Sequence, residues 1–148
     1  MSKNSFKVLR PGINTTFQDL GRDNLYHVGL PFSGAIDKRN FLIANSLITN
    51  KEDDAVLEFA YQGPLLEFSG SQTSIVITGN VNFKIIKKDT SEIKGECYRT
   101  YNLNDKDCLD IISTEKSVYG YLSVKGGFQL DKFCNSYSTT VRAEVGPN

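Results

Sequence analysis

The chain has 148 residues, 39% of them hydrophobic and 23% charged, and Lys+Arg 17 balance Asp+Glu 17. This length predicts one domain over residues 1–148, and the composition excludes disordered and fibrous classes. The zero net charge argues against a nucleic-acid partner. No apolar run is long enough to cross a membrane, and no targeting signal opens the chain, so we expect a cytoplasmic protein.

The first predicted element is a short strand at Phe6–Leu9, which ends before Pro11-Gly12. Residues 37–48 are the only stretch that predicts a helix, because they lack Gly and Pro and place Phe41, Ala44 and Ile48 at helical spacing. Asp37 is the expected N-cap. Asn50 is the expected left-handed residue that ends the helix.

Alternation of apolar and polar residues, which is typical of half-buried strands, dominates the rest of the chain. The predicted strands are Ala55–Tyr61, Leu65–Phe68, Ser74–Thr78, Val81–Ile86, a return strand after the turn at 88–91, Cys97–Leu103, a strand with Leu109 and Ile111, and Val118–Val124. In the last strand, Val118, Leu122 and Val124 share one face, and Tyr119, Tyr121 and Ser123 share the other.

These elements predict a mainly β fold, an antiparallel barrel or sandwich with one main helix near residues 37–48. The chain stops at Gly146-Pro147-Asn148, which is turn chemistry that ordinarily leads into another element. We therefore expect the fold to continue beyond the last residue.

The three cysteines, Cys97, Cys108 and Cys134, form neither a disulfide framework nor a C-x-x-C motif. The chain has a single histidine, His27, so no metal site is predicted. Cys97 and Cys108 lie in apolar, strand-like stretches. We interpret both as small buried hydrophobic residues.

The segment 10–37 gathers ionisable side chains of both signs among glycines and prolines. One interpretation is a loop that faces a substrate just before a helix N-terminus. The other is an Ω-like loop whose charges pair with one another, and composition alone favours this second one. Taken singly, His27 fits a structural histidine and Ser33 fits a turn or cap hydroxyl. The sequence contains no phosphate-binding loop.

Ordered motifs along the chain nevertheless resemble a known family. They are Arg10-Pro11-Gly12, Thr16 to Arg22, Gly29 to Asp37, Ala44-Asn45-Ser46-Leu47, Glu58 with Gly63-Pro64, Thr78-Gly79, Tyr121 to Gly127, and Asn135 to Thr139. Together they resemble the allophanate hydrolase subunit 2 family, also named the biotin-dependent carboxyltransferase family, which includes the C subunit of 5-oxoprolinase.

The resemblance implies a cyclophilin-like antiparallel β-barrel, the first of the two barrels that members usually carry. It implies a subunit, inactive alone, that acts with a subunit 1 family protein and a lactam-utilisation subunit in the ATP-dependent opening of 5-oxoproline to glutamate. ATP would be shared with those partners. Two alternatives stay open: a regulatory module that docks on the subunit 1 protein, and the carboxyltransferase part of a urea carboxylase, whose biotin would sit on a partner.

For the enzyme hypothesis we expect four catalytic residues, with Arg22 holding an anion, Asp19 and Asp37 orienting the substrate, and His27 relaying a proton. We expect substrate contacts from Ser33, Gly34, Glu58 and Ser136. The closing motif of the family usually has Gly and Arg where this chain has Asn135 and Tyr137. An anion contact near Ser136 is therefore weakened.

Overall fold

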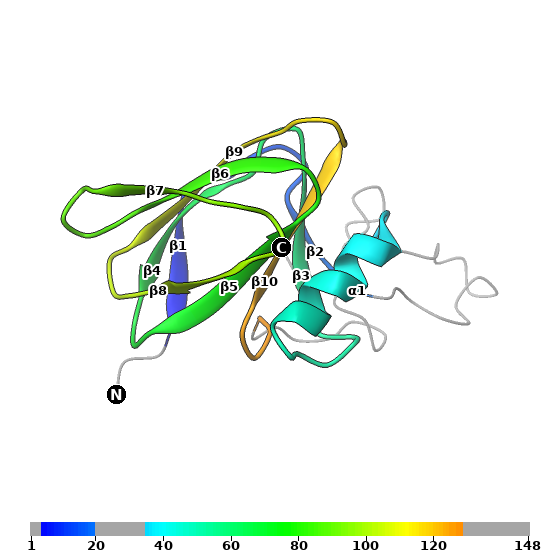
Figure 1. The fold of residues 1–148 in the computed structure, drawn as a ribbon, viewed down its shortest axis with the longest axis horizontal. Coiled ribbons are helices and arrows are strands. Elements are labelled where there is room, and N and C mark those ends of the chain that lie inside the picture. Colours follow the sequence, from blue (N-terminus) through cyan, green and yellow to red (C-terminus); the bar gives the residue numbers. More distant parts are fainter. Residues whose placement is uncertain (1–3, 20–34, 129–148) are drawn as a thin grey trace.

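The computed structural model describes residues 4–19 and 35–128, and these contain one helix and ten strands (Figure 1). In chain order the elements are β1 (Ser5–Arg10), β2 (Thr16–Gln18), α1 (Lys38–Leu47), β3 (Val56–Ala60), β4 (Leu65–Ser69), β5 (Thr73–Thr78), β6 (Val81–Ile86), β7 (Glu92–Lys94), β8 (Thr100–Leu103), β9 (Cys108–Thr114) and β10 (Tyr119–Val124). The predicted mainly β fold with one helix is confirmed.

The strands form two antiparallel five-stranded sheets, which we call sheet A and sheet B. Sheet A has the order β1-β4-β9-β6-β7, and sheet B has the order β2-β3-β10-β5-β8. Within the described residues, strand pairing does not join the two sheets into one closed ring. The architecture is therefore an open arrangement of two packed sheets, and its strands are antiparallel as predicted.

The main core lies between the sheets. Alternate residues of facing strands meet there because successive side chains in a strand point to opposite sides. Its fully buried members are Phe59, Ile75, Ile77, Phe83, Leu103, Leu109, Ile111 and Leu122. At one side this core opens into a cleft of about 930 Å³, lined by residues of β1, β3, β4 and β10. Phe128 packs against both Phe6 and Phe17 along it.

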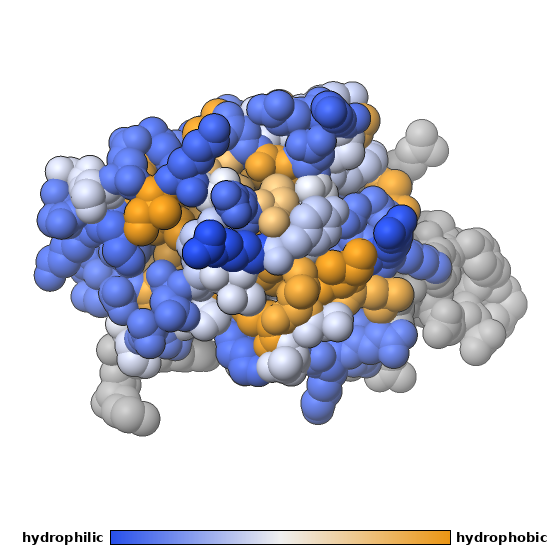
Figure 2. All heavy atoms as spheres, viewed as in Figure 1, coloured by the Kyte–Doolittle hydropathy of each residue, from blue (hydrophilic) through white to orange (hydrophobic). Residues whose placement is uncertain are grey.

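Helix α1 covers the other face of sheet B, where it contacts β3, β5 and β10 (Figure 1). Phe41, Ala44 and Ile48 are buried against Val56 and Tyr121 in a second, smaller core. Apolar residues also gather on the exposed side of α1 (Figure 2), where Leu47 is 42% exposed. No helix in the described residues is long and apolar enough to cross a membrane.

The sequence predicted the N-terminal end of α1 correctly but not its C-terminal end. Asp37 is the N-cap as expected, because its side chain accepts the backbone N–H of Asn40. The prediction that Asn50 ends the helix in the left-handed conformation is wrong. Thr49 has the positive φ of 57°, and Asn50 donates its backbone N–H to Asn45, which completes a Schellman-type ending.

Two further predictions need correction. The strand expected over Cys97–Leu103 begins only at Thr100, since Tyr98 has a φ of 64°, which no strand accommodates. Cys97 and Cys108 are half-buried rather than buried, although Cys97 does pack against the main core. Burial raises the pKa of both thiols. The three-residue strand β2 was not predicted, because it is too short to show alternation.

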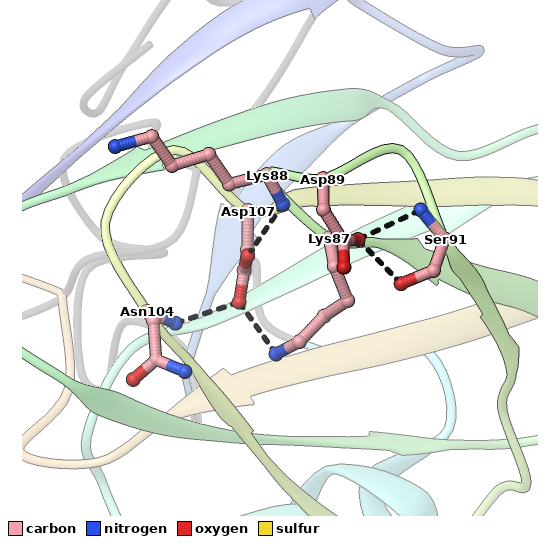
Figure 3. A network of polar contacts seen from close by, with 6 residues as sticks. All are labelled: Lys87, Lys88, Asp89, Ser91, Asn104 and Asp107. Atoms are coloured by element: carbon pink, nitrogen blue, oxygen red, sulfur yellow. Dashed lines mark hydrogen bonds and ion pairs between the residues drawn. The ribbon is translucent and has the colours of Figure 1, made fainter.

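Asp107 links the turn after β8 to the end of β6 (Figure 3). Its carboxylate accepts the Lys87 ammonium at 2.7 Å, the Asn104 N–H at 2.8 Å and the Lys88 N–H at 3.2 Å. Burial alone would raise the pKa of Asp107, but these donors and the Lys87 charge outweigh it and hold the pKa below its ordinary value. The ionised form is therefore part of the fold.

Truncation of a core residue tests the packing between the sheets. Leu109 is fully buried, so Leu109→Ala should lower the free energy of unfolding by about 2–5 kcal/mol. Leu47→Ala, on the exposed side of α1, is the control and should cost about 0.5 kcal/mol or less. Denaturant titration measures both. Equal effects would contradict the assignment of the core.

The Asp107 network makes a prediction about pH. Because the folded pKa lies below the unfolded value of about 3.9, its stabilisation is present above roughly pH 4 and is lost as the pH falls through the folded pKa. At pH 7, Asp107→Asn should cost about 1–3 kcal/mol. Its difference from the natural chain should shrink at pH 3.

Asp89→Asn is the matched control for this experiment. Asp89 is an exposed carboxylate that accepts hydrogen bonds from Ser91 within its own turn, and these bonds also lower its pKa (Figure 3). Because Asp89 is exposed, we expect Asp89→Asn to cost less than Asp107→Asn at pH 7. The measurement is the urea midpoint of the natural chain and of both variants at pH 7 and at pH 3, from which the stability loss of each variant is compared between the two pH values. A difference for Asp107→Asn that does not change with pH would argue against an ionised carboxylate.

Candidate functional site at the start of helix α1

The segment Ala35–Asp37, which leads into α1, is bound to three neighbouring strands of sheet B in succession. The Ala35 N–H donates to the carbonyl of Asp19, directly after β2, at 3.0 Å. The Ile36 N–H donates to Glu58 Oε2 on β3 at 3.0 Å. The Asp37 N–H donates to Tyr121 Oη on β10 at 2.8 Å. Three consecutive amides are therefore held by three adjacent strands.

Glu58 and Tyr121 form the centre of this arrangement. They lie directly opposite each other in the β3–β10 ladder, so both side chains project from the face that α1 covers. The Tyr121 hydroxyl donates to Glu58 Oε2 at 2.6 Å, and the exposed fractions are 0% for Tyr121 and 4% for Glu58. One carboxylate oxygen therefore accepts from both Tyr121 and Ile36.

Burial changes the acidity of both groups. It raises the pKa of Glu58 above its ordinary value, while the hydrogen bonds from Tyr121 and Ile36 act in the opposite direction. Burial and the neighbouring Glu58 also raise the pKa of Tyr121. The phenol therefore keeps its proton at neutral pH, which is what its donation to Glu58 requires.

Asp37 connects this centre to the surface of the protein. Its carboxylate oxygens accept the backbone N–H of Asn40 at 3.1 Å and the side-chain amide of Asn40 at 2.7 Å. Asn40 Oδ1 in turn accepts the Tyr98 hydroxyl at 2.6 Å. Tyr98 Oη accepts the N–H of Gly79 at 3.2 Å. An open hollow of about 690 Å³ borders Asn40, Gly79 and Tyr98, with Lys116 at its edge.

The structure brings three of the eight predicted site residues into one region. Asp19 is buried directly after β2, Asp37 caps the helix, and Glu58 on β3 accepts the N–H of Ile36, the residue before Asp37. Arg22, His27, Ser33, Gly34 and Ser136 lie outside the described residues. Nothing in the geometry assigns chemistry to Asp19, Asp37 or Glu58, so their catalytic and substrate-binding roles stay predictions. Among residues 4–19 and 35–128, no group of His, Cys, Asp and Glu side chains could hold a metal ion.

Sequence reasoning missed Tyr121, Asn40 and Tyr98 as parts of this region. For Tyr121 a signal was present, since the alternation of β10 already separated it from Leu122 and Val124. A tyrosine on the face opposite the main core needs a partner for its hydroxyl if that face is also covered. Asn40 and Tyr98 gave no such signal, because 58 residues separate them in the chain.

Residues 28–148 match the model of the family described as carboxyltransferase domain, subdomain A and B. The chain belongs to this carboxyltransferase-domain family. The match begins within the segment that precedes α1 and includes β3 to β10. The resemblance that the ordered motifs indicated is therefore confirmed.

Named relatives are longer than this chain. It is 32% identical over 131 residues to the C subunit of 5-oxoprolinase from Haemophilus influenzae, a match that covers 88% of the chain and 41% of the relative. It is 29% identical over 143 residues to urea amidolyase of Saccharomyces cerevisiae, which covers 96% of the chain and 8% of the relative. The crystal structure of K. lactis urea amidolyase superposes with a TM-score of 0.81 at 30% identity, over 90% of this chain and 8% of that one.

The helix cap gives a prediction that separates the contribution of the capping hydrogen bond at Asp37 from that of its negative charge. Asp37→Ala removes the cap and should lower the free energy of unfolding by about 0.5–2 kcal/mol. Asp37→Ser keeps a capping oxygen and removes the charge, so it should recover most of that loss. Thermal or urea unfolding measures both variants. Equal losses would mean that the negative charge, and not the cap, stabilises this end of α1.

Proposed function

We propose that this chain forms part of a 5-oxoprolinase subunit that acts with partner subunits in the ATP-dependent opening of 5-oxoproline to glutamate. The observation that carries the proposal is the 32% identity to the C subunit of 5-oxoprolinase over 88% of the chain. ATP is handled together with the partners, which are a subunit 1 family protein and a lactam-utilisation subunit. In this proposal a second barrel, which the family resemblance implies, completes the subunit.

Lactam opening sets clear chemical demands. In this proposal ATP transfers its γ-phosphoryl group to the ring amide oxygen and leaves as ADP. Water then adds to the carbonyl carbon, and the ring C–N bond breaks as the nitrogen takes up a proton. A second water hydrolyses the resulting acyl phosphate to glutamate and inorganic phosphate. The developing negative charge needs fixed hydrogen-bond donors, whose value depends on their being held in place beforehand. The amides of Ala35, Ile36 and Asp37 already donate to acceptors of sheet B, so they fix the segment that leads into α1 and are not themselves the donors to this charge. In this proposal Arg22 supplies the anion contact and His27 the mobile proton.

A second candidate is the carboxyltransferase part of a urea amidolyase, with biotin carried on a partner segment. The 29% identity to the yeast urea amidolyase over 96% of the chain favours it. Both reactions act at a carbonyl carbon bonded to nitrogen, so one scaffold serves either. A regulatory module that only docks on the subunit 1 protein is the third possibility, and it differs by binding without turnover.

A pair of chimeras separates these functions. In the first, residues 1–148 replace the matching segment of the C subunit of Haemophilus influenzae 5-oxoprolinase. In the second, they replace the matching segment of the yeast urea amidolyase. We expect the first chimera to bind its partner subunits and support 5-oxoproline-dependent phosphate release from ATP. We expect the second to fail in urea-dependent ATP hydrolysis.

The two natural enzymes are the positive controls. The isolated chain is the negative control and should release no phosphate from ATP. Urea-dependent turnover by the second chimera alone would favour the carboxyltransferase hypothesis over ours. Partner binding by the first chimera, without turnover by either, would favour the regulatory module.

A further inference from the structure

We propose that Glu58 and Tyr121 are positioning residues, which hold the Ile36 and Asp37 amides and so fix the start of α1 and its cap Asp37. This inference rests on the proposed function for its catalytic part. Its structural part stands on the hydrogen bonds of the described residues alone. It assigns Glu58 to support rather than to substrate contact, and it adds Tyr121, which no sequence motif singled out for a role.

The first step is that the backbone N–H groups of Ile36 and Asp37 need hydrogen-bond acceptors from outside the helix. The Asp37 N–H, at the N-cap, has no intrahelical partner, and the Ile36 N–H lies before the helix, so each amide needs an acceptor from outside α1. Here the acceptors come from side chains of the sheet: Glu58 Oε2 at 3.0 Å from the Ile36 nitrogen, and Tyr121 Oη at 2.8 Å from the Asp37 nitrogen. The two donors are consecutive, so both the position and the direction of the segment are fixed.

The second step is the choice of residue types. A carboxylate beneath a helix carries a large desolvation cost, which packing alone would never require, because an apolar residue of similar size fills the same space. Glu58 instead accepts two hydrogen bonds on one oxygen, and Tyr121 both donates to it and accepts from Asp37. A buried network of mutually dependent hydrogen bonds of this kind specifies one geometry.

The third step is the connection to the motif residues. Asp37 is the N-cap, and Ser33 and Gly34 directly precede the anchored amides in the chain. A displacement of Ile36 and Asp37 therefore moves the end of that motif with it. Positioned groups lose much of their effect when they move by an ångström, so the anchor should act on turnover more than on substrate affinity.

Tyr121→Phe is the central variant. It keeps the ring that packs against α1 and removes one oxygen, so Asp37 loses its acceptor and Glu58 loses a donor. Glu58→Gln is the conservative partner, because its amide oxygen accepts both bonds. Tyr101→Phe is the matched control, since Tyr101 Oη likewise accepts one backbone N–H, that of Glu96, at 2.8 Å, in the loop between β7 and β8.

The first measurement is amide hydrogen exchange by NMR on the chain itself, which needs no enzymatic activity. We expect Tyr121→Phe to speed exchange at Asp37 and Ile36 roughly tenfold or more relative to the β5 amides, which report global unfolding. Glu58→Gln should retain protection, and Tyr101→Phe should change exchange only near Glu96. Unchanged protection at Asp37 in Tyr121→Phe would overturn the anchor.

The second measurement is steady-state kinetics in the 5-oxoprolinase chimera. We expect Tyr121→Phe to lower kcat about tenfold or more with KM within about threefold, and Glu58→Gln to stay within about threefold of the parent. Faster exchange with unchanged kcat would show an anchor without a catalytic role and overturn the positioning claim. An inactive parent chimera would count against the proposed function, while the exchange data would still decide the anchor.

Discussion

The central strands of sheet B, β3, β10 and β5, are buried on both faces, and the rest of the structure depends on this constraint. All five residues of β3 are buried, because alternate side chains enter the core between the sheets while the others face α1. A sheet with two apolar faces needs a cover on each of them. Sheet A provides one cover and α1 the other, so the helix is a required layer and its first residues are held against the sheet.

Apolar packing alone leaves a helix free to slide or rotate, and polar contacts remove that freedom here. Ser123 donates to Asn45 at 3.1 Å, Thr78 donates to the Asn40 carbonyl at 2.8 Å, and Asn50 donates to the Val124 carbonyl at 2.8 Å. Many of these residues belong to the motifs that carried the family resemblance. These motif residues therefore hold α1 against sheet B. Because their role here is structural, recognising the motifs identifies the family without identifying a reaction.

Sequence predicted what local physics determines. The strands with clear alternation and the helix with its Asp37 cap were found, since each depends on neighbours a few residues away. Features that depend on tertiary contacts were not predicted. Thr49 rather than Asn50 takes the left-handed conformation, and the Asn50 side chain hydrogen-bonds to the backbone of Val124 and Gly126. The pairing of Glu58 with Tyr121, 63 residues apart, depends on β10 lying beside β3. No pattern within either strand reports that.

The same dependence links the site to folding. The three acceptors of Ala35, Ile36 and Asp37 come from Asp19, Glu58 and Tyr121, which meet only when β2, β3 and β10 are paired in order. The anchored segment can therefore take up its position only on a completed sheet, after the long-range contacts that form slowly. A buried carboxylate is costly to the folded state, and Glu58 lies at the point where three strands meet the start of the helix. The stability of sheet B thus sets how firmly the segment before α1 is held.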